Sequence, residues 1–327
     1  MHILITGAAG MIGRKLTARL VRDGALNGHA IDRMTLTDIA APEAPAGATF
    51  AVATAASDLA AADGAARAIA DRPDVIFHLA AIVSGEAEAD FEKGYRVNFG
   101  GTRELLEAIR LAGGGYRPKL VFASSIAVFG APFPDAIGDE FFLTPLTSYG
   151  TQKAIGELLL ADYTRRGFLD GIGIRLPTIV VRPGKPNKAA SGFFSSIIRE
   201  PLNGQEAVLP VSEDVRHWFA SPRAAVGFLL HAADLEGDRL GGRINLTMPG
   251  LACTVGEEIA ALARVAGADV AGRIRREPDA TVAKIVAGWP QNFDARRATA
   301  LGFRAETSFD EIVRAHIEDE LGGRVGG

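Results

Sequence analysis

The chain has 327 residues, of which 48% are hydrophobic and 23% charged, a balance typical of a globular protein that buries a sizeable core. Its formal net charge is −4 and it has no Lys/Arg cluster, which argues against nucleic acid as a partner. No apolar run approaches the roughly 20 residues of a membrane span and no secretion signal is recognisable, so we expect a cytoplasmic protein without membrane contact. The single cysteine, Cys253, cannot form an internal disulfide and is expected to be a small buried residue, and no metal site is predicted.

Short β-like runs alternate with helix-like stretches along the first half of the chain. Apolar runs predict strands over residues 2–6, 33–39, 48–53, 74–80 and 119–124. Apolar residues at helical spacing predict helices over 11–23 and 97–112. This alternation predicts an α/β protein with a Rossmann-type doubly wound parallel sheet, covered by helices on both faces.

The composition and pattern of the sequence change after about residue 180, where prolines become frequent and the hydrophobic periodicity weakens. We therefore expect a nucleotide-binding domain with the catalytic groups over residues 1–180. Residues 181–327 are expected to form mainly a smaller substrate-binding lobe, interleaved with the last strands of the sheet.

A glycine-rich turn follows the first predicted strand and opens the first predicted helix, in "TGAAGMIG". Such a strand–turn–helix junction directs unpaired backbone N–H groups at one point, which suits a pyrophosphate. Gly7 would permit the turn, Gly10 the approach of phosphates and Gly13 the close packing of helix and strand. The spacing G-x-x-G-x-x-G differs from the usual G-x-G-x-x-G, so a purely structural turn remains an alternative.

The second predicted strand ends in an acid, Asp38, 25 residues after Gly13. A carboxylate at this place can accept hydrogen bonds from the adenosine ribose and would repel a 2′-phosphate, which favours NAD over NADP. No arginine directly follows Asp38 to receive that phosphate. The alternative for Asp38 is a surface or helix-capping acid.

Tyr149 and Lys153 are four residues apart in "SYGTQK" and share one face if this segment is a helix. An ammonium beside a phenol favours the phenolate and can make it a general base. Ser124 and Ser125 end the fifth predicted strand, at the sheet edge where doubly wound folds bind ligands. A lone Y-x-x-x-K is common by chance, whereas the glycine turn, the acid, the serines and Y-x-x-x-K in this order are not.

The chain thus resembles the extended short-chain dehydrogenases/reductases, the NAD-dependent epimerase/dehydratase group. The resemblance runs through "TGAAGMIG", "HLAA", "VNFGGT", "SSIAVFG", "YGTQK" and "RLPTIVVRPG", more than half of the chain in order. It implies Tyr149 as base, Lys153 as ribose anchor and pKa modifier, and Ser125, which precedes "IAVFG", as the hydroxyl that orients the substrate. In this family a homodimer often forms through the helices near residues 100 and 155.

The resemblance also implies which residues surround NAD. Met11 and Ile12 would lie under the pyrophosphate, and Asp58 and Leu59 would flank the adenine. The remaining implied cofactor-site residues are Ala80 and Ala81 beside the cofactor, Asn98 in the helix behind the site and Pro177 against the nicotinamide. Phe129 replaces a tyrosine of many relatives and is expected to be a packing residue, and His78 is expected to be a core histidine.

The stretch "DVRHWFASPRAAVGF" keeps an arginine, Arg216, at the place where nucleotide-sugar members bind a diphosphate. The residues after it, His217 and Trp218, depart from that pattern, and Arg216 could instead pair with a small carboxylate or be a structural arginine. Four longer blocks resemble sugar-acid dehydrogenases of the family and imply oxidation of a four-carbon sugar acid at C2. Ser84, Ser125, Tyr149, Asn187, Ser191 and Arg216 are the candidate substrate-binding residues. A nucleotide-sugar epimerase or dehydratase, a uronate-type dehydrogenase and a non-catalytic NAD sensor remain alternatives.

Overall fold

The computed structural model describes residues 1–184 and 191–326, and the chain divides into two compact units. The first comprises Met1–Val128, Pro145–Leu176 and Val226–Leu246, and the second Phe129–Thr144, Pro177–Ala225 and Thr247–Gly327. Both units are therefore built from segments that are distant in the sequence.

A seven-stranded sheet organises the first unit, with the strand order β13-β9-β7-β6-β1-β4-β5. Its strands are β1 His2–Thr6, β4 Arg33–Asp38, β5 Ala51–Ala56, β6 Val75–His78, β7 Lys119–Ser125, β9 Asp170–Leu176 and β13 Asn245–Thr247. The pairings from β5 across to β9 are all parallel. After β1 the chain builds outward first on one side, through β4 and β5, and then on the other, from β6, which makes the edge after β1 a topological switch point. The predicted Rossmann-type sheet is thus confirmed.

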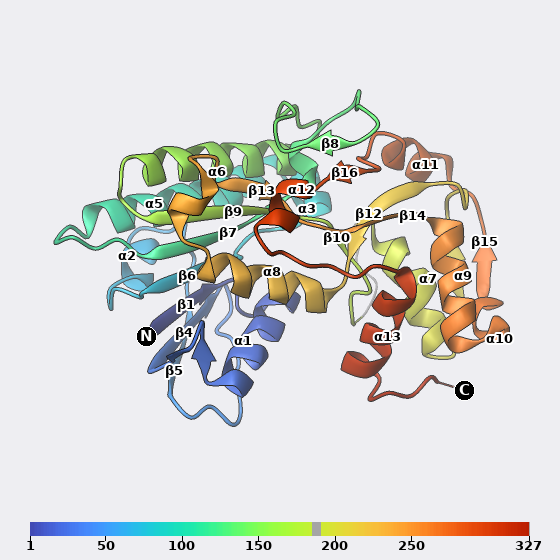
Figure 1. The fold of residues 1–327 in the computed structure, drawn as a ribbon, viewed down its shortest axis with the longest axis horizontal. Helices are drawn as coiled ribbons and strands as arrows, with labels where there is room; N and C mark the ends of the chain where they lie inside the picture. Colours follow the sequence, from blue (N-terminus) through green and yellow to red (C-terminus); the bar gives the residue numbers. More distant parts are fainter. Residues whose placement is uncertain (185–190, 327) are drawn as a thin grey trace. The chain divides into compact units, whose positions relative to one another are not determined.

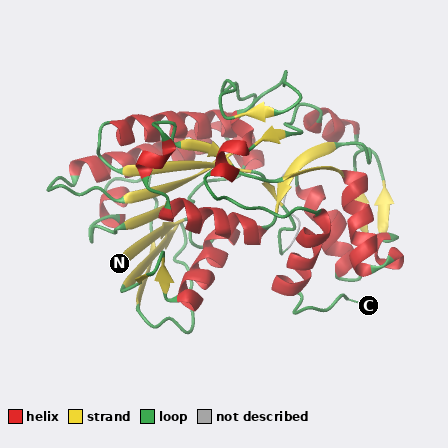
Figure 2. Ribbon diagram, in the orientation of Figure 1, coloured by secondary structure: helices red, strands yellow, loops and turns green. Residues whose placement is uncertain are grey.

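Helices cover the two faces of this sheet (Figures 1 and 2). Helices α5 (Gly101–Leu111) and α6 (Ser148–Arg165) lie along one face, and α1 (Met11–Asp23) and α8 (Pro222–Asp234) along the other. The buried residues of α1, Gly13, Leu16, Thr17 and Leu20, recur at helical spacing, which is why the sequence predicted this helix with its observed ends. The smaller elements of the unit are β2 Ala25–Leu26, β3 His29–Ala30, α2 Gly64–Ala68, α3 Ser84–Ala89, α4 Phe91–Gly94, η1 Tyr95–Gly100, η2 Ile126–Val128 and η3 Gly237–Leu240.

Two predicted elements differ from the structure. The strand expected over 48–53 is β5, Ala51–Ala56, an edge strand with mostly exposed side chains, so its start is set by pairing with β4 and not by an apolar pattern. The helix expected over 97–112 is instead the π-helical turn η1 followed by α5. A π-turn keeps the chain helical but adds a residue per turn, which apolar periodicity does not reveal.

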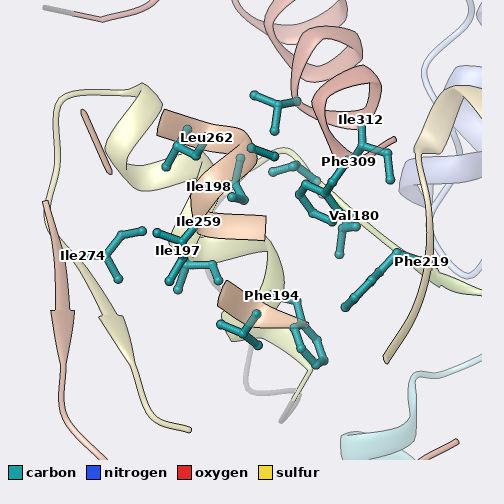
Figure 3. Close-up of a cluster of buried hydrophobic side chains, with 14 of the residues drawn as sticks. Val180, Phe194, Ile197, Ile198, Phe219, Ile259, Leu262, Ile274, Phe309 and Ile312 are labelled. Atoms are coloured by element: carbon teal, nitrogen blue, oxygen red, sulfur yellow. The ribbon is translucent and has the colours of Figure 1, made fainter. Parts of the chain in front are cut away.

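The second unit packs short sheets and helices around its own apolar core. Its elements are β8 Ile137–Gly138, β10 Thr178–Ile179, α7 Gly192–Leu202, β11 Ala207–Leu209, β12 Arg216–Ala220, β14 Leu251–Thr254, α9 Val255–Ala266, α10 Ala268–Ala271, β15 Ile274–Arg276, α11 Ala280–Val286, β16 Phe293–Asp294, α12 Arg296–Ala300 and α13 Phe309–Glu320. Figure 3 shows Phe194 of α7, Phe219 of β12, Leu262 of α9 and Phe309 of α13 within this core.

Two single-residue expectations are confirmed in the second unit. Cys253 is a buried free cysteine on β14, and burial raises the pKa of its thiol. Phe129 is a packing residue, with its ring centroid 6.1 Å from that of Phe141 and 5.8 Å from that of Phe293. Among the described residues, no helix is long and apolar enough to cross a membrane, and no cluster of three or more His, Cys, Asp or Glu is arranged to hold a metal.

Candidate active site

The glycine turn is packed so tightly that side chains do not fit at two of its positions. Gly7 has a φ of 75°, and a Cβ on it would lie 2.6 Å from the backbone nitrogen of Ala80, in the segment after β6. A Cβ on Gly13 would lie 2.4 Å from the carbonyl oxygen of Gly7. At Gly10 the corresponding distance to that oxygen is 3.2 Å. The turn, the start of α1 and the Ala80 segment therefore meet through their backbones.

The amino-terminal end of α1 has the features of an anion site. The first intrahelical hydrogen bond runs from the Arg14 N–H to the Gly10 carbonyl, over 2.9 Å, so the N–H groups of Met11, Ile12 and Gly13 precede it. Gly10 provides no side-chain cap and the first turn of α1 contains no acidic residue, so no carboxylate of this turn competes for these donors. A side-chain-free cradle of this kind fits a pyrophosphate.

Asp38 lies beside this turn at the end of β4. One of its carboxylate oxygens accepts a hydrogen bond from the Ala9 N–H over 3.0 Å, and the other from the Ile39 N–H over 2.7 Å. The acid is thereby held against the glycine turn, in the place where a ribose-binding carboxylate is needed. The other acid implied for the cofactor site, Asp58, forms an ion pair with Arg96 over 2.5 Å and accepts from the Ala60 N–H, next to the buried Leu59.

The first turn of helix α6 approaches the end of strand β7 very closely, because a glycine stands at the point of contact. Thr147 caps the helix, accepting from the Gly150 N–H over 3.0 Å. A Cβ on Gly150 would lie 2.1 Å from the carbonyl oxygen of Ala127 in η2, directly after β7. Sequence reasoning missed Gly150, although a threonine three residues before a glycine in a helix start was a usable signal. This contact brings the first turn of α6, with Tyr149, against the end of β7.

Ser125, Tyr149 and Lys153 thus belong to two elements that pack directly on each other. The Ser125 hydroxyl is half-buried and accepts from the Ala127 N–H over 3.1 Å. Ser124 is buried, and its hydroxyl donates to Glu157 over 2.5 Å, so it is engaged away from the site. The structure therefore favours Ser125 over Ser124 as the available hydroxyl.

Lys153 is buried with its ammonium fixed at one place. Its Nζ donates to the carbonyl oxygen of Ala123 over 2.8 Å and lies 5.7 Å from the centroid of the Tyr149 ring. Burial disfavours the charged form and lowers the pKa of Lys153 to about 8, against the attraction of Glu157, which raises it. A cation beside the Tyr149 ring in a site of low polarity is suited to stabilising a phenolate.

His78 ends β6 inside the sheet core, as expected. Its Nδ1 is 2.8 Å from the Thr6 hydroxyl and its Nε2 is 2.9 Å from the Thr102 hydroxyl, which itself donates to the Asn98 carbonyl. Burial lowers the pKa of His78 to about 3, which favours the neutral ring, and both ring nitrogens already have hydroxyl partners. The expectation of a core histidine is confirmed.

Asn98 lies in η1 and joins the segment after β6 to α6. Its side chain accepts from the Ile82 N–H over 2.8 Å, and its amide donates to the Ile82 carbonyl over 3.2 Å and to Gln152 over 2.8 Å. Gln152 was not predicted, because nothing in the sequence pairs it with a residue 54 positions earlier. Asn98 therefore braces the helix that holds Tyr149 and Lys153.

The other candidate substrate residues are distributed over both units. Ser84 begins α3 in the first unit and is exposed. In the second unit, Arg216 is on β12 and donates to the Ala252 carbonyl over 3.0 Å, with Glu257 3.6 Å away. Ser191 accepts from Arg182 over 2.8 Å, a contact that sequence reasoning missed. Asn187 lies outside the described residues, and Pro177 stands between β9 and β10 in the sequence.

The residues after Arg216 are core residues of the second unit. His217 Nε2 is 2.7 Å from the Thr178 hydroxyl, and its ring is stacked on Phe194 at a centroid distance of 5.2 Å. Burial lowers the pKa of His217 to about 4. Trp218 is buried and donates to the Met248 carbonyl over 3.2 Å.

The sheet, the glycine turn with Asp38 and the Ser-Tyr-Lys arrangement define the class of this protein. The model of the NAD-dependent epimerase/dehydratase family matches residues 3–246, and the chain belongs to this family. The chain is therefore a member of an NAD-dependent family, in agreement with the cradle of glycines and the acid beside it.

Particular relatives are similar over the whole length. D-erythronate dehydrogenase from Cupriavidus necator is 50% identical over 323 residues, which cover 98% of both chains. D-erythronate dehydrogenase from Haemophilus influenzae is 42% identical over 321 residues, 98% of this chain and 100% of the relative. A crystal structure described as the nucleoside-diphosphate-sugar epimerase from Agrobacterium tumefaciens is 64% identical with a TM-score of 0.97, covering 99% of this chain and 95% of that one. L-threonine dehydrogenase from Cupriavidus necator, at 22% identity and a TM-score of 0.84 over 98% of this chain and 99% of its own, shares the fold.

Proposed function

We propose that this protein is an NAD-dependent dehydrogenase that oxidises D-erythronate at C2 to 2-dehydro-D-erythronate. The observation that supports this proposal most is the full-length similarity, at 50% and 42% identity, to two proteins named for this activity. The close approach of α6, which holds Tyr149 and Lys153, to the end of β7, where Ser125 stands, supports the reaction type. These residues offer a hydroxyl that can orient an alcohol, a phenol that can act as general base and a cation that favours the phenolate, which suits oxidation of an alcohol.

In this proposal NAD, when bound, supplies the hydride acceptor. The glycine turn with Met11 and Ile12 would hold its pyrophosphate, and Asp38 its adenosine ribose. Asp58 and Leu59 would flank the adenine, Ala80, Ala81 and Pro177 would line the cofactor, and Asn98 would brace the site from behind.

The chemical step depends on three side chains. Tyr149, as phenolate, takes the proton of the C2 hydroxyl, while Ser125 hydrogen-bonds to that hydroxyl and orients it. Lys153 remains protonated beside the Tyr149 ring, 5.7 Å from its centroid, and favours the phenolate by its charge. Ser84, Asn187, Ser191 and Arg216 are the proposed partners of the substrate carboxylate and the remaining hydroxyls.

The test is formation of NADH from D-erythronate by the purified protein, followed for the wild type and for Tyr149→Phe. Removal of one phenolic oxygen should reduce kcat by at least about 10²-fold, the usual contribution of a general base, without loss of the fold. Tyr116→Phe is the matched control. Among the described residues, the hydroxyl of Tyr116 donates a hydrogen bond only to the carbonyl oxygen of Pro73, over 2.9 Å. Unaltered turnover by Tyr149→Phe would remove Tyr149 from the mechanism.

A second candidate, a nucleotide-sugar epimerase, is favoured by the description of the 64% identical structure from Agrobacterium tumefaciens. It would interconvert a nucleotide sugar with no net NADH release. The buried roles of His217 and Trp218 argue against it, because they replace the residues that follow the diphosphate-binding arginine in such members. An assay of four- to six-carbon sugar acids, uronates included, beside nucleotide sugars distinguishes the dehydrogenase from the epimerase. Binding of NAD without turnover of any compound on this panel would instead favour a non-catalytic NAD sensor.

We also propose a homodimer formed through α5 and α6. Leu111 on α5 and Leu158 on α6 are 68% and 65% exposed, and large apolar side chains at this exposure often lie in interfaces. Leu158→Arg should shift the sedimentation coefficient from that of a dimer to that of a monomer. A wild-type protein that sediments as a monomer would contradict the proposal.

A further inference from the structure

One buried carboxylate joins two neighbouring strands, β7 and β9, to the helix that holds Tyr149 and Lys153. Glu157 on α6 is fully buried and accepts from the Ser124 hydroxyl of β7 over 2.5 Å. It also accepts from Arg175 of β9, from Nε over 3.0 Å and from the terminal nitrogen over 2.8 Å. The side chain of Arg175 is only 6% exposed, so this is an ion pair inside the core.

The positions of these three residues relate directly to the active site. Glu157 is one helical turn after Lys153, Ser124 immediately precedes Ser125, and Ser124 is the register partner of Arg175 in the sheet. Any sliding of α6 along β7 would stretch bonds to two strands at once. These bonds therefore oppose movement of the helix that holds Tyr149 and Lys153 relative to the strand that ends in Ser125.

We propose that Glu157 is a positioning residue: its bonds to β7 and β9 fix α6, and with it Tyr149 and Lys153, on the strand that ends in Ser125, and its carboxylate is the anion that faces the Lys153 ammonium. This inference rests on the proposed roles of Tyr149 and Lys153. A buried ion pair is weak evidence for a role in stability, because it can often be replaced by apolar residues without loss.

The groups around Lys153 show why one nearby anion matters. Lys153 faces Glu157 and Tyr149 from its own helix and His78 from β6, and Arg175 of β9 lies beyond Glu157. His78 is neutral, and its pKa is lowered mainly by burial and further by Lys153. Burial pulls the pKa of Lys153 down to about 8, and the attraction of Glu157 is the influence that opposes this. Without Glu157, the ammonium would lose its proton at lower pH, and Tyr149 would lose the cation that favours its phenolate.

The experiment replaces the carboxylate by an amide, Glu157→Gln, and follows kcat/KM for D-erythronate against pH. The low-pH limb of the profile, where the phenolate forms, should move to higher pH by about 1 unit or more, the shift expected when a nearby cation is lost. A folded variant that keeps the wild-type profile would overturn the proposal, even if its activity or stability were lower.

A second variant covers the case in which Glu157→Gln strands the Arg175 charge and fails to fold. Glu157→Gln combined with Arg175→Met removes both charges, and it should show the same direction of shift, since the anion is missing in both. The matched control is Asp170→Asn, which breaks an ion pair with Lys119, 3.3 Å long, at the other end of the same two strands. The control should lose stability and leave the pH profile in place.

A measurement without substrate separates this inference from the proposed reaction. The near-ultraviolet absorbance of phenolate is titrated for each protein and for its Tyr149→Phe counterpart, and the difference reports Tyr149 alone. Glu157→Gln should move this titration to higher pH. If the wild type does not oxidise D-erythronate, the proposed substrate fails while this titration still decides the role of Glu157, and an unmoved titration overturns that role.

Discussion

Substitution of Gly13 by alanine should separate α1 from the glycine turn. A Cβ at this position would lie 2.4 Å from the Gly7 carbonyl oxygen and 2.7 Å from the Cα of Ala8, whereas ordinary contacts are about 3.5 Å or longer. Both neighbours are backbone atoms, so no side-chain rotation can relieve the clash. The start of α1 must therefore move away from the turn by about 1 Å.

The cost of this displacement can be estimated from overpacking in protein cores. Forcing a methyl group into a packed site costs about 1–3 kcal/mol, while alanine in place of glycine gains up to about 1 kcal/mol in a helix. With the full gain subtracted, we expect a net loss of up to about 2 kcal/mol in the free energy of unfolding. Because the displaced N–H groups are those proposed for the pyrophosphate, the Kd for NAD should rise at least about tenfold, or about 1.4 kcal/mol.

Urea denaturation and titration calorimetry with NAD measure these two quantities. Gly227→Ala is the matched control, because Gly227 lies inside α8 and a Cβ there would have no neighbour within 4 Å apart from the adjacent residues and the backbone of its own helix. The control should gain about 0.5–1 kcal/mol in stability and bind NAD normally. A Gly13→Ala protein with wild-type stability and wild-type NAD affinity would refute the reasoning.

Three further predictions concern single side chains. Asp38→Ala should narrow the preference for NAD over NADP in kcat/KM by about tenfold, since the carboxylate no longer repels a 2′-phosphate, and an unchanged ratio would place the ribose acid elsewhere. Burial lowers the pKa of His78 to about 3, so the folded chain holds fewer protons than the unfolded chain between about pH 3 and 6.5. Stability should therefore fall as the pH drops through this window, by up to about 1.4 kcal/mol per pH unit. His78→Phe should flatten this slope in denaturation experiments at a series of pH values, and an identical slope would contradict the neutral state of His78. Glu258 is fully buried, and neither of its carboxyl oxygens has a hydrogen-bond partner among the described residues. Burial raises the pKa of Glu258 well above its usual value, so stability should fall as the pH rises above about 4.5. Glu258→Met should gain about 1–3 kcal/mol in the free energy of unfolding at neutral pH, and equal stability of the two proteins there would show that burial of this carboxyl costs nothing.

The parts of the site that were predictable are those in which a short stretch of chain contains the whole signal. The glycine turn, the acid at the end of β4 and the Y-x-x-x-K of α6 each depend on residues within one turn or one strand end. Helix α1 was predicted with its observed ends, because its buried residues recur at helical spacing. Gly150 and Thr147 could have been found by the same kind of local argument.

Residues whose partners are distant in the sequence could not be predicted in this way. Glu157 and Arg175 are 18 residues apart, and Asn98 and Gln152 are 54 apart. Their pairing depends on which strand lies next to β7 and on the residue at which α6 meets it. The start of β5 and the π-turn around Asn98 were misjudged for the same reason, since neighbouring elements decide them.

The sequence by itself determined the fold class and singled out the glycine turn, Ser125, Tyr149 and Lys153 as candidates, because glycine positions, strand ends and helical spacing are properties of neighbouring residues. Only the tertiary structure decided that Ser124 is engaged by Glu157 and that His78 is neutral. It also decided that Lys153 is buried, which lowers the pKa of its ammonium to about 8. Burial and cross-strand register control these properties, and both arise only when distant segments pack against each other.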